Sequence, residues 1–221
     1  MKKALFCSMF LVLVLLAACT KENPEPIYSP SADELPIPRQ QLSIQSEGGM
    51  DFALYTDKTA VLVGVSGENL PSTLTIPESY ESYVIIGIES DALRESSFTE
   101  ITLPDTLQFI GERAFQRSAI TRIRVPDSVV QVEKDAFDNC FYLEKVVLGQ
   151  GLTEIPMGMF YSCRSLREVI LPEGVVRIGD EAFADCKALE RVTLPDSLQE
   201  IGSQAFWNSG TKSLAFSIPP C

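Results

Sequence analysis

The chain has 221 residues, of which 45% are hydrophobic and 22% charged, a composition typical of a folded domain rather than a disordered one. Its formal net charge of −12 lacks the basic excess that nucleic-acid-binding proteins use to neutralise phosphates. It contains no histidine, which removes the usual general base near neutral pH and the commonest metal ligand. We therefore expect no nucleic-acid partner and no histidine-dependent catalysis.

The N-terminus has the pattern of an export signal. A short basic start precedes an apolar run over residues 4–18, and Cys19 follows that run directly. The run is shorter than the roughly 20 apolar residues that a membrane-spanning helix needs. The segment Leu16-Ala17-Ala18-Cys19 resembles the bacterial lipobox, and this resemblance implies a signal peptide over residues 1–18 and lipid attachment at Cys19. The alternative is an ordinary secretory signal with a chance cysteine.

Residues 19–47 are expected to form a proline-rich tether, because five prolines lie between Asn23 and Pro38 and proline favours extended chain. Thr20 is not the aspartate that typically retains lipoproteins in the inner membrane. The lipobox resemblance therefore implies an outer-membrane lipoprotein, and we expect it to be displayed on the cell surface.

From residue 88 onward the sequence repeats a segment of the form Ile-Gly-x-x-Ala-Phe. The segments end at Leu93, Phe115, Phe137, Phe160, Phe183 and Phe206, with spacings of 22, 22, 23, 23 and 23 residues. A small residue, serine or cysteine, follows three positions after each, and a strand-like Leu-x-x-Val-x-Leu-Pro comes next. A fixed period in this range is the mark of a solenoid, in which each repeat is one coil.

The repeat predicts a leucine-rich repeat solenoid with a right-handed superhelix. The alternation of Val-x-Leu is typical of a strand buried on one face, so the strands should form a parallel concave sheet. The Ile-Gly-x-x-Ala-Phe segment should return the chain on the convex side through a short helical or 3₁₀ turn. The recurrent phenylalanines should stack into one aromatic column. These repeats are expected over residues 70–221, as about six units of 22–23 residues.

A solenoid needs its terminal coils covered. Residues 52–55 and 61–65 read as two strands joined by a turn, so residues 48–69 are expected to form an N-terminal β-hairpin cap. The first coil's strand is expected at Leu74-Thr75-Ile76. At the other end Trp207 is a candidate for covering part of the last coil.

The repeat, including its variant Leu148-Gly149-Gln150-Gly151, resembles that of the BspA-like bacterial cell-surface leucine-rich repeat family over roughly residues 70–219. The resemblance implies a cell-surface protein, and some members of the family are implicated in adhesion. The chain is shorter than the long adhesins and offers less surface.

Three cysteines, Cys140, Cys163 and Cys186, occupy one repeat position in consecutive coils. A buried column of small thiols is the favoured interpretation, because serine fills the same position elsewhere; a disulfide or a metal site is the alternative. Cys221 is expected to be exposed and more reactive. Acidic residues that follow the strand-ending prolines are interpreted as solvated turns rather than a glycosidase pair; they are Glu78, Asp105, Asp127, Glu173 and Asp196.

The outward positions of the predicted sheet contain basic residues around two aliphatic ones in an otherwise acidic protein. This arrangement favours an interface for an acidic protein or an anionic glycan; the alternative is an ordinary solvated strand face. The candidate binding face consists of Arg122, Arg124, Lys145, Val147, Glu168, Ile170 and Arg191.

Together these patterns predict a lipid-anchored, non-enzymatic binding or adhesion module whose partner is an extracellular protein or glycan. We expect no cofactor and no metal, attachment to the membrane through the lipid on Cys19, and a monomer. The alternative is a structural or accessory subunit that binds a partner within an outer-membrane complex.

Overall fold

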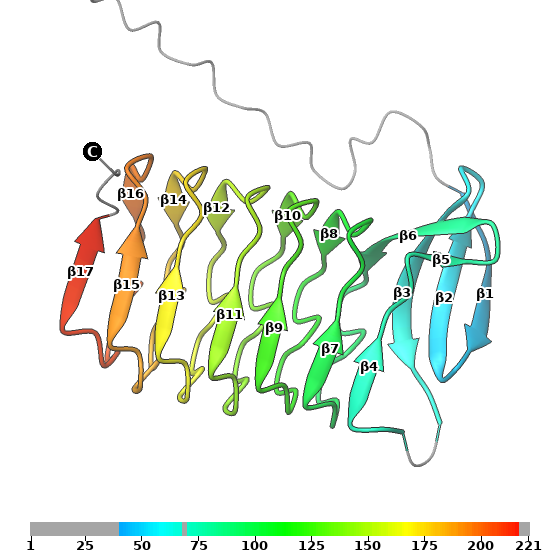
Figure 1. The fold of residues 1–221 in the computed structure, drawn as a ribbon, viewed down its shortest axis with the longest axis horizontal. Helices are drawn as coiled ribbons and strands as arrows, with labels where there is room; N and C mark the ends of the chain where they lie inside the picture. The colour runs from blue at the N-terminus through cyan, green and yellow to red at the C-terminus, as the bar shows by residue number, and fades with distance from the viewer. Residues whose placement is uncertain (1–39, 68–69, 217–221) are drawn as a thin grey trace, which may run out of the picture. The chain divides into compact units, whose positions relative to one another are not determined.

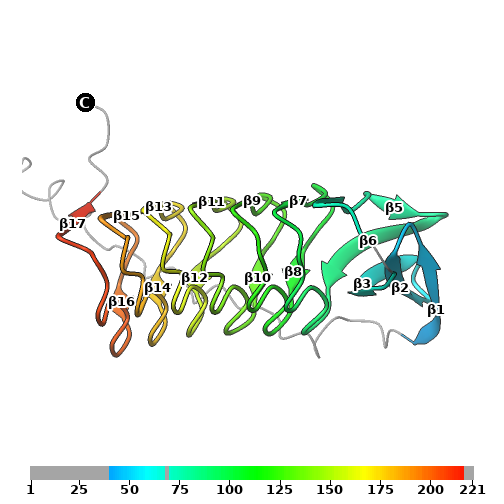
Figure 2. The same ribbon diagram turned by 90° about the horizontal axis from the view of Figure 1, so that it is seen from below.

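The structure, a computed structural model, describes residues 40–67 and 70–216. These residues form seventeen strands and no helix (Figure 1). From β4 to β17 the chain winds through successive coils that stack side by side (Figure 2). The mainly β, parallel solenoid predicted from the repeat is confirmed.

The largest parallel array, hereafter the main sheet, has the strand order β17-β15-β13-β11-β9-β7-β4. Its strands are β4 (Thr73–Thr75), β7 (Glu100–Thr102), β9 (Arg122–Arg124), β11 (Lys145–Val147), β13 (Glu168–Ile170), β15 (Arg191–Leu194) and β17 (Ser213–Phe216). In each three-residue strand the central side chain is buried and its two neighbours are exposed. Period-2 alternation in the sequence therefore sets which residues face the core and which face solvent.

A second set of short parallel strands, which was not predicted from the sequence, runs along another side of the coils. These strands are β8 (Phe109–Ile110) and β10 (Gln131–Val132), and, in a separate three-stranded sheet, β12 (Glu154–Ile155), β14 (Arg177–Ile178) and β16 (Glu200–Ile201).

The glycine that often follows the isoleucine of the repeat is required by the packing of neighbouring coils. A Cβ at Gly111 would lie 2.5 Å from the backbone nitrogen of Ser90, and one at Gly179 would lie 2.6 Å from that of Met157. Neighbouring coils therefore approach closely at this point.

The prediction of helical or 3₁₀ turns is wrong. Alternate backbone N–H groups of these turns donate within their own turn and to the next coil. Gln116 N–H donates within its own turn to the Arg113 carbonyl at 3.0 Å. Phe115 N–H donates instead to the Ala136 carbonyl in the next coil at 2.8 Å. Arg113 and Arg117 have φ values of 54° and 57°, which turn every second amide toward that neighbour. A helix keeps its bonds within one segment, so this alternation excludes one.

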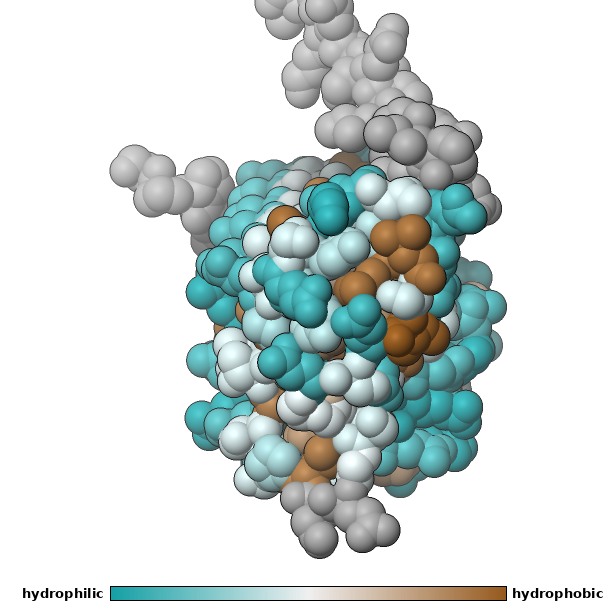
Figure 3. All heavy atoms as spheres, turned by 90° about the vertical axis from the view of Figure 1, so that its right-hand side faces the viewer, coloured by the Kyte–Doolittle hydropathy of each residue, from teal (hydrophilic) through white to brown (hydrophobic). Residues whose placement is uncertain are grey.

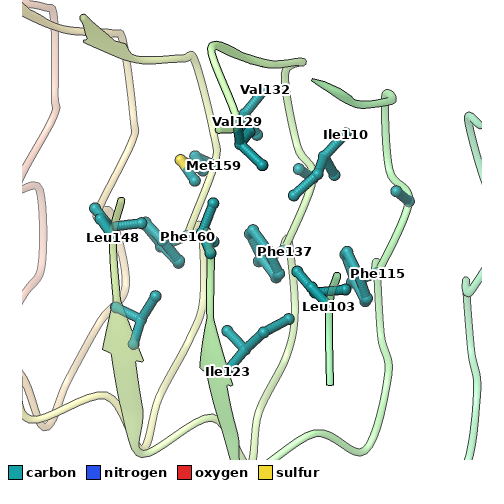
Figure 4. Close-up of a cluster of buried hydrophobic side chains, with 14 of the residues drawn as sticks. Leu103, Ile110, Phe115, Ile123, Val129, Val132, Phe137, Leu148, Met159 and Phe160 are labelled. Carbon is teal, nitrogen blue, oxygen red and sulfur yellow. The ribbon is translucent and has the colours of Figure 1, made fainter. Parts of the chain in front are cut away.

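The phenylalanines stack into the predicted column in the core. Ring centroids of successive residues from Phe115 to Phe206 lie 4.9, 5.5, 5.4 and 5.3 Å apart, with planes within 16° of parallel. Phe115, Phe137 and Phe160 lie among aliphatic side chains from both strand sets (Figure 4). Each ring fills the space between two coils, which couples the coils into one core.

The predicted N-terminal hairpin is confirmed: β2 (Met50–Tyr55) pairs antiparallel with β3 (Thr59–Val65). β3 then pairs in parallel with β6 (Tyr83–Ile88), which is also joined by β5 (Ser79–Tyr80). Phe52 stacks on Tyr80 with ring centroids 5.4 Å apart. The hairpin therefore shares one hydrophobic core with the coils.

The cap has a third strand that falls inside the segment expected as a tether. β1 (Gln41–Glu47) pairs antiparallel with β2 through a turn at Gly48 and Gly49, whose φ values of 58° and 79° suit glycine. Leu42 and Ile44 alternate with polar residues, which is the pattern of a strand. This pattern was overlooked because the prolines earlier in the segment favoured a tether. The remaining tether and the signal peptide lie outside the described residues, as do Cys19 and Cys221.

Candidate binding surface on the main sheet

Outward side chains of the main sheet form two rows that cross the strands. Register pairs align the first row: Lys145 lies between Arg122 and Glu168. This row, hereafter the charged row, consists of Glu100, Arg122, Lys145, Glu168 and Arg191. The second row consists of Thr102, Arg124, Val147, Ile170 and Thr193, of which Val147 and Ile170 are aliphatic. All ten side chains are at least partly exposed.

An open pocket of about 660 Å³ lies over strands β9, β11 and β13. Five of the seven predicted binding-face residues line it: Arg122, Lys145, Val147, Glu168 and Ile170. The two aliphatic side chains among them are unusually open for their type, with Val147 45% and Ile170 64% exposed. Large apolar side chains held open beside charged ones are typical of a contact surface.

The other two predicted residues lie outside this pocket. Arg124 lines a smaller pocket of about 480 Å³ together with Thr75, Thr102 and Asp105. Arg191 forms an ion pair with Glu168, with Nε and Oε1 3.4 Å apart, and 70% of its side chain is exposed. Such an exposed pair contributes little to stability.

Two further pocket residues, Glu144 and Arg167, were missed from the sequence. Each directly precedes a strand of the main sheet, and their backbones are linked by a bond from Arg167 N–H to the Glu144 carbonyl at 3.4 Å. The sequence prediction of the binding face covered only the two outward positions within each strand. The 23-residue spacing of these two positions was the available signal.

Basic side chains on the turns and on the main sheet differ in their ion pairs. On the turns and the short second strands, several cations bridge to acids of neighbouring coils, as in Arg113–Asp91 at 3.0 Å and Arg177–Glu200 at 3.3 Å, although Arg164 and Lys187 on the described turns do not. Within the described ranges, four cations around the main sheet have no carboxylate within 4.0 Å: Arg122, Arg124, Lys145 and Arg167. Their charges are therefore available to a partner.

Two exposed aromatic residues precede β11. Tyr142 is 63% and Phe141 40% exposed, and the guanidinium of Arg164 lies 5.1 Å from the centre of the Phe141 ring. A cation over an aromatic face is a favourable contact. These residues lie in the link between a turn and a strand, which was not predicted to contribute to a binding surface.

The cysteine column is buried, and its three thiols are free. Each Sγ donates to the carbonyl of a phenylalanine in the preceding coil, at 3.0 Å for Cys140, 3.2 Å for Cys163 and 3.0 Å for Cys186. Burial raises the pKa of Cys140 and of Cys186 to about 12. The favoured interpretation of a buried thiol column is therefore confirmed, with a hydrogen-bonding role that size alone did not suggest.

The acidic residues after the strand-ending prolines are all exposed, as expected of solvated turns. Asp127 also accepts a bond from the backbone N–H of Gln150 in the next coil at 2.9 Å. In the part of the chain that the structure describes, no three side chains of the metal-binding types gather into a cluster. Nor does that part contain a helix long and apolar enough to span a bilayer.

A solenoid of short parallel strands with this repeat defines a leucine-rich repeat protein. The sequence of residues 86–216 matches the BspA type leucine rich repeat region in six copies. Because this match covers more than half of the chain, the protein belongs to that family. Among curated proteins, none matches the chain significantly.

Solved bacterial structures share the fold. A leucine-rich repeat protein of T. pallidum is 24% identical with a TM-score of 0.62, covering 79% of this chain and 86% of that one. One from Eubacterium ventriosum is 19% identical with a TM-score of 0.61, covering 77% of this chain and 50% of that one. The pneumococcal vaccine antigen PcpA is 18% identical with a TM-score of 0.53, covering 79% of this chain and 50% of that one. This chain thus spans about half the length of the last two.

Proposed function

We propose that this protein is a lipid-anchored binding module of the cell surface, without catalytic activity, which contacts a protein or glycan through the main sheet. The lipid is attached at Cys19, and the segment that follows holds the solenoid away from the outer membrane. The contact surface is centred on the pocket over β9, β11 and β13. Family membership supports a binding role, since leucine-rich repeat solenoids commonly present an extended sheet to partners. The likeness to a vaccine antigen supports surface display.

One observation carries the proposal: unpaired cations surround exposed aliphatic side chains. Arg122, Lys145 and Arg167 line the pocket without an ion-pair partner in the described chain, although the protein carries a net charge of −12. Val147 and Ile170 are exposed in the same pocket. Burying these two against a partner would release water from apolar surface, and the cations would select a partner that carries negative charge.

The partner's chemistry follows from this arrangement. An acidic protein surface or an anionic glycan complements the three cations of the pocket, Arg122, Lys145 and Arg167. Glu144 and Glu168 in the same pocket limit how much negative charge can be accepted there. We therefore expect binding that weakens with salt but keeps an apolar, salt-resistant component.

A charge-reversal comparison tests the proposal. The site variant combines Arg122→Glu, Lys145→Glu and Arg167→Glu. The control combines Arg117→Glu, Lys134→Glu and Arg177→Glu, which changes the net charge equally at cations that the structure places in ion pairs away from the pocket. Binding is measured to immobilised heparin, as an anionic glycan, and to a panel of extracellular matrix proteins.

The site variant should lose at least about tenfold in affinity for whichever probe the native protein binds, while the control stays near the native value. Thermal unfolding of both variants checks that the fold is retained. Equal losses in the two variants would show that net charge, rather than the pocket, governs binding.

A further inference from the structure

Among the described residues, no strand pairs with the outer edge of β1 in the cap sheet. Strand β1 is the outermost strand in the order β1-β2-β3-β6-β8-β10. Six of its seven residues are exposed, including Leu42 at 54% and Ile44 at 58%. The surface at this end of the molecule shows a patch of apolar side chains (Figure 3). An edge strand with open backbone groups and exposed apolar side chains is a template for pairing with another strand.

This edge has few of the features that protect edge strands. Proteins usually block such edges with lysine, proline, shortness or a bulge. Residues 41–47 contain no basic residue and no proline, and Glu47 is their only acid. The bulge is confined to the start of the strand, between Gln41 and Ser43, and leaves five consecutive register pairs from Ser43 to Glu47. The opposite edge of the same sheet, β10, is only two residues long.

The sequence of β1 is complementary to itself. If two copies pair antiparallel about Ile44, then Ile44 faces its own copy and Ser43 faces Gln45. The same register places Gln41 opposite Glu47, an amide donor opposite a carboxylate, and no two like charges meet. A highly charged strand from another protein would lack these complementary pairs, because the central residues of β1 are uncharged.

The pairing would also extend an apolar row that already crosses the cap. Register pairs align Ile44 with Ala53, Ala53 with Val61 and Val61 with Gly87, so these residues share one face of the sheet. Ala53 and Val61 are each only 1% exposed, whereas Ile44, at the end of the row, is open. A second Ile44 beside the first would continue the row across the edge.

We infer that this protein forms a twofold dimer in which β1 pairs antiparallel with β1 of a second copy, centred on Ile44. This inference departs from the monomer expected from the sequence. The interface is isologous, so it closes at two copies and does not propagate into fibres. A contact built on one strand from each copy is smaller than a standard stable interface, so the dimer should depend on concentration.

Disulfide trapping tests the geometry in cells that export the full chain. Directly opposed residues of an antiparallel pair have Cβ atoms about 4.5–5.5 Å apart, close to the separation that a disulfide needs. Both cysteine variants, Ile44→Cys and its control, also carry Cys221→Ser, because the thiol at the C-terminus is expected to be reactive. The Ile44→Cys variant should then form a covalent dimer on a non-reducing gel, with the bridge mapped to position 44 by mass spectrometry of peptides. The matched control is Val130→Cys, because Val130 is also 54% exposed but lies on another part of the solenoid.

A second measurement uses a charge instead of a thiol. The full chain, solubilised in a mild detergent, is analysed by sedimentation over a concentration series. An Ile44→Lys variant places two lysines opposite each other and should weaken association by about tenfold or more, whereas Val130→Lys should not change it. The inference is overturned if position 44 remains unbridged, if Val130→Cys forms as much covalent dimer, or if Ile44→Lys associates like the native chain.

Discussion

The Sγ atom of Cys163 donates a hydrogen bond to the carbonyl oxygen of Phe137, 3.2 Å away in the preceding coil. Cys140 and Cys186 repeat this relationship with the carbonyls of Phe115 and Phe160. At this repeat position each cysteine side chain therefore bonds its coil to the backbone of the preceding coil, at a phenylalanine of the aromatic column. The serines at this repeat position do not make the same bond among the described residues. Ser118 Oγ lies 3.4 Å from Cys140 Sγ, Ser209 Oγ donates to Thr211 Oγ1, and the buried Ser96 Oγ has no partner, so small size is what all six positions share.

Removing the thiol donor should lower the free energy of unfolding more than replacing it with a hydroxyl. Cys163→Ala leaves a small cavity and weakens the bonding of the buried Phe137 carbonyl, so we expect a loss of about 1–2 kcal/mol in the free energy of unfolding. Cys163→Ser keeps a donor of nearly the same size and should lose less. Urea denaturation of the two variants beside the native chain measures the difference. Equal losses would mean that the thiol bond adds nothing to stability.

The buried thiols should make stability fall in alkaline solution. Burial raises the pKa of Cys140 and of Cys186 from the ordinary value of 9.0 to about 12, and it raises the pKa of Cys163 well above 9.0. Below pH 9 these thiols keep their protons in both the folded and the unfolded chain, so they add no pH dependence. Above pH 9 only the unfolded chain releases them, so each thiol should lower the free energy of unfolding by about 1.4 kcal/mol per pH unit.

The measurement is urea denaturation at intervals from pH 8 to pH 11, on the native chain and on a variant with serine at all three positions. The native chain should lose stability with the steeper slope. The same burial predicts that a thiol reagent modifies these cysteines only after urea is added. Parallel slopes in the two proteins would contradict the pKa directions.

The aromatic column should be most sensitive in its middle. Phe160 is fully buried between Phe137 and Phe183, so Phe160→Ala should cost about 3–5 kcal/mol in the free energy of unfolding. Phe206 is partly exposed and stacks on Phe183 alone within the described column, so Phe206→Ala should cost clearly less.

The control for this series is Tyr142→Ala, which removes an aromatic ring that is 63% exposed. It should change stability by no more than about 0.5 kcal/mol. If Phe206→Ala were as costly as Phe160→Ala, the last coil would be covered as well as the middle ones.

Side-chain periodicity made the fold predictable. The 22- and 23-residue spacings placed the phenylalanines, and the alternation of Val146 between Lys145 and Val147 identified which face is buried. What could not be predicted depends on the backbone. The short second strands and the left-handed residues such as Arg113 are set by hydrogen bonds between coils, which any non-proline residue can make.

The candidate surface was predictable in part for a related reason. Residues that alternate within a strand project from one face, so Lys145 and Glu168 could be placed side by side. Arg167 precedes its strand, where alternation no longer fixes direction, and it was missed although it lines the same pocket. The lack of ion pairs at Arg122 and Lys145 also depends on distances that only the folded coils define.

The anchor and the location can be tested together by protease treatment of intact cells. The strand β1 begins at Gln41, so the proposed tether runs from Thr20 to Gln40 and contains two trypsin sites, after Lys21 and after Arg39. In the polyproline II conformation a chain of that length spans about 65 Å. Trypsin should release the solenoid as a folded fragment that begins at Glu22 or Gln40, identified by mass. A Cys19→Ala variant should be lost from the membrane fraction, because it cannot carry the lipid. If trypsin cleaves the protein only after the outer membrane is broken, the solenoid faces the periplasm and adhesion is excluded.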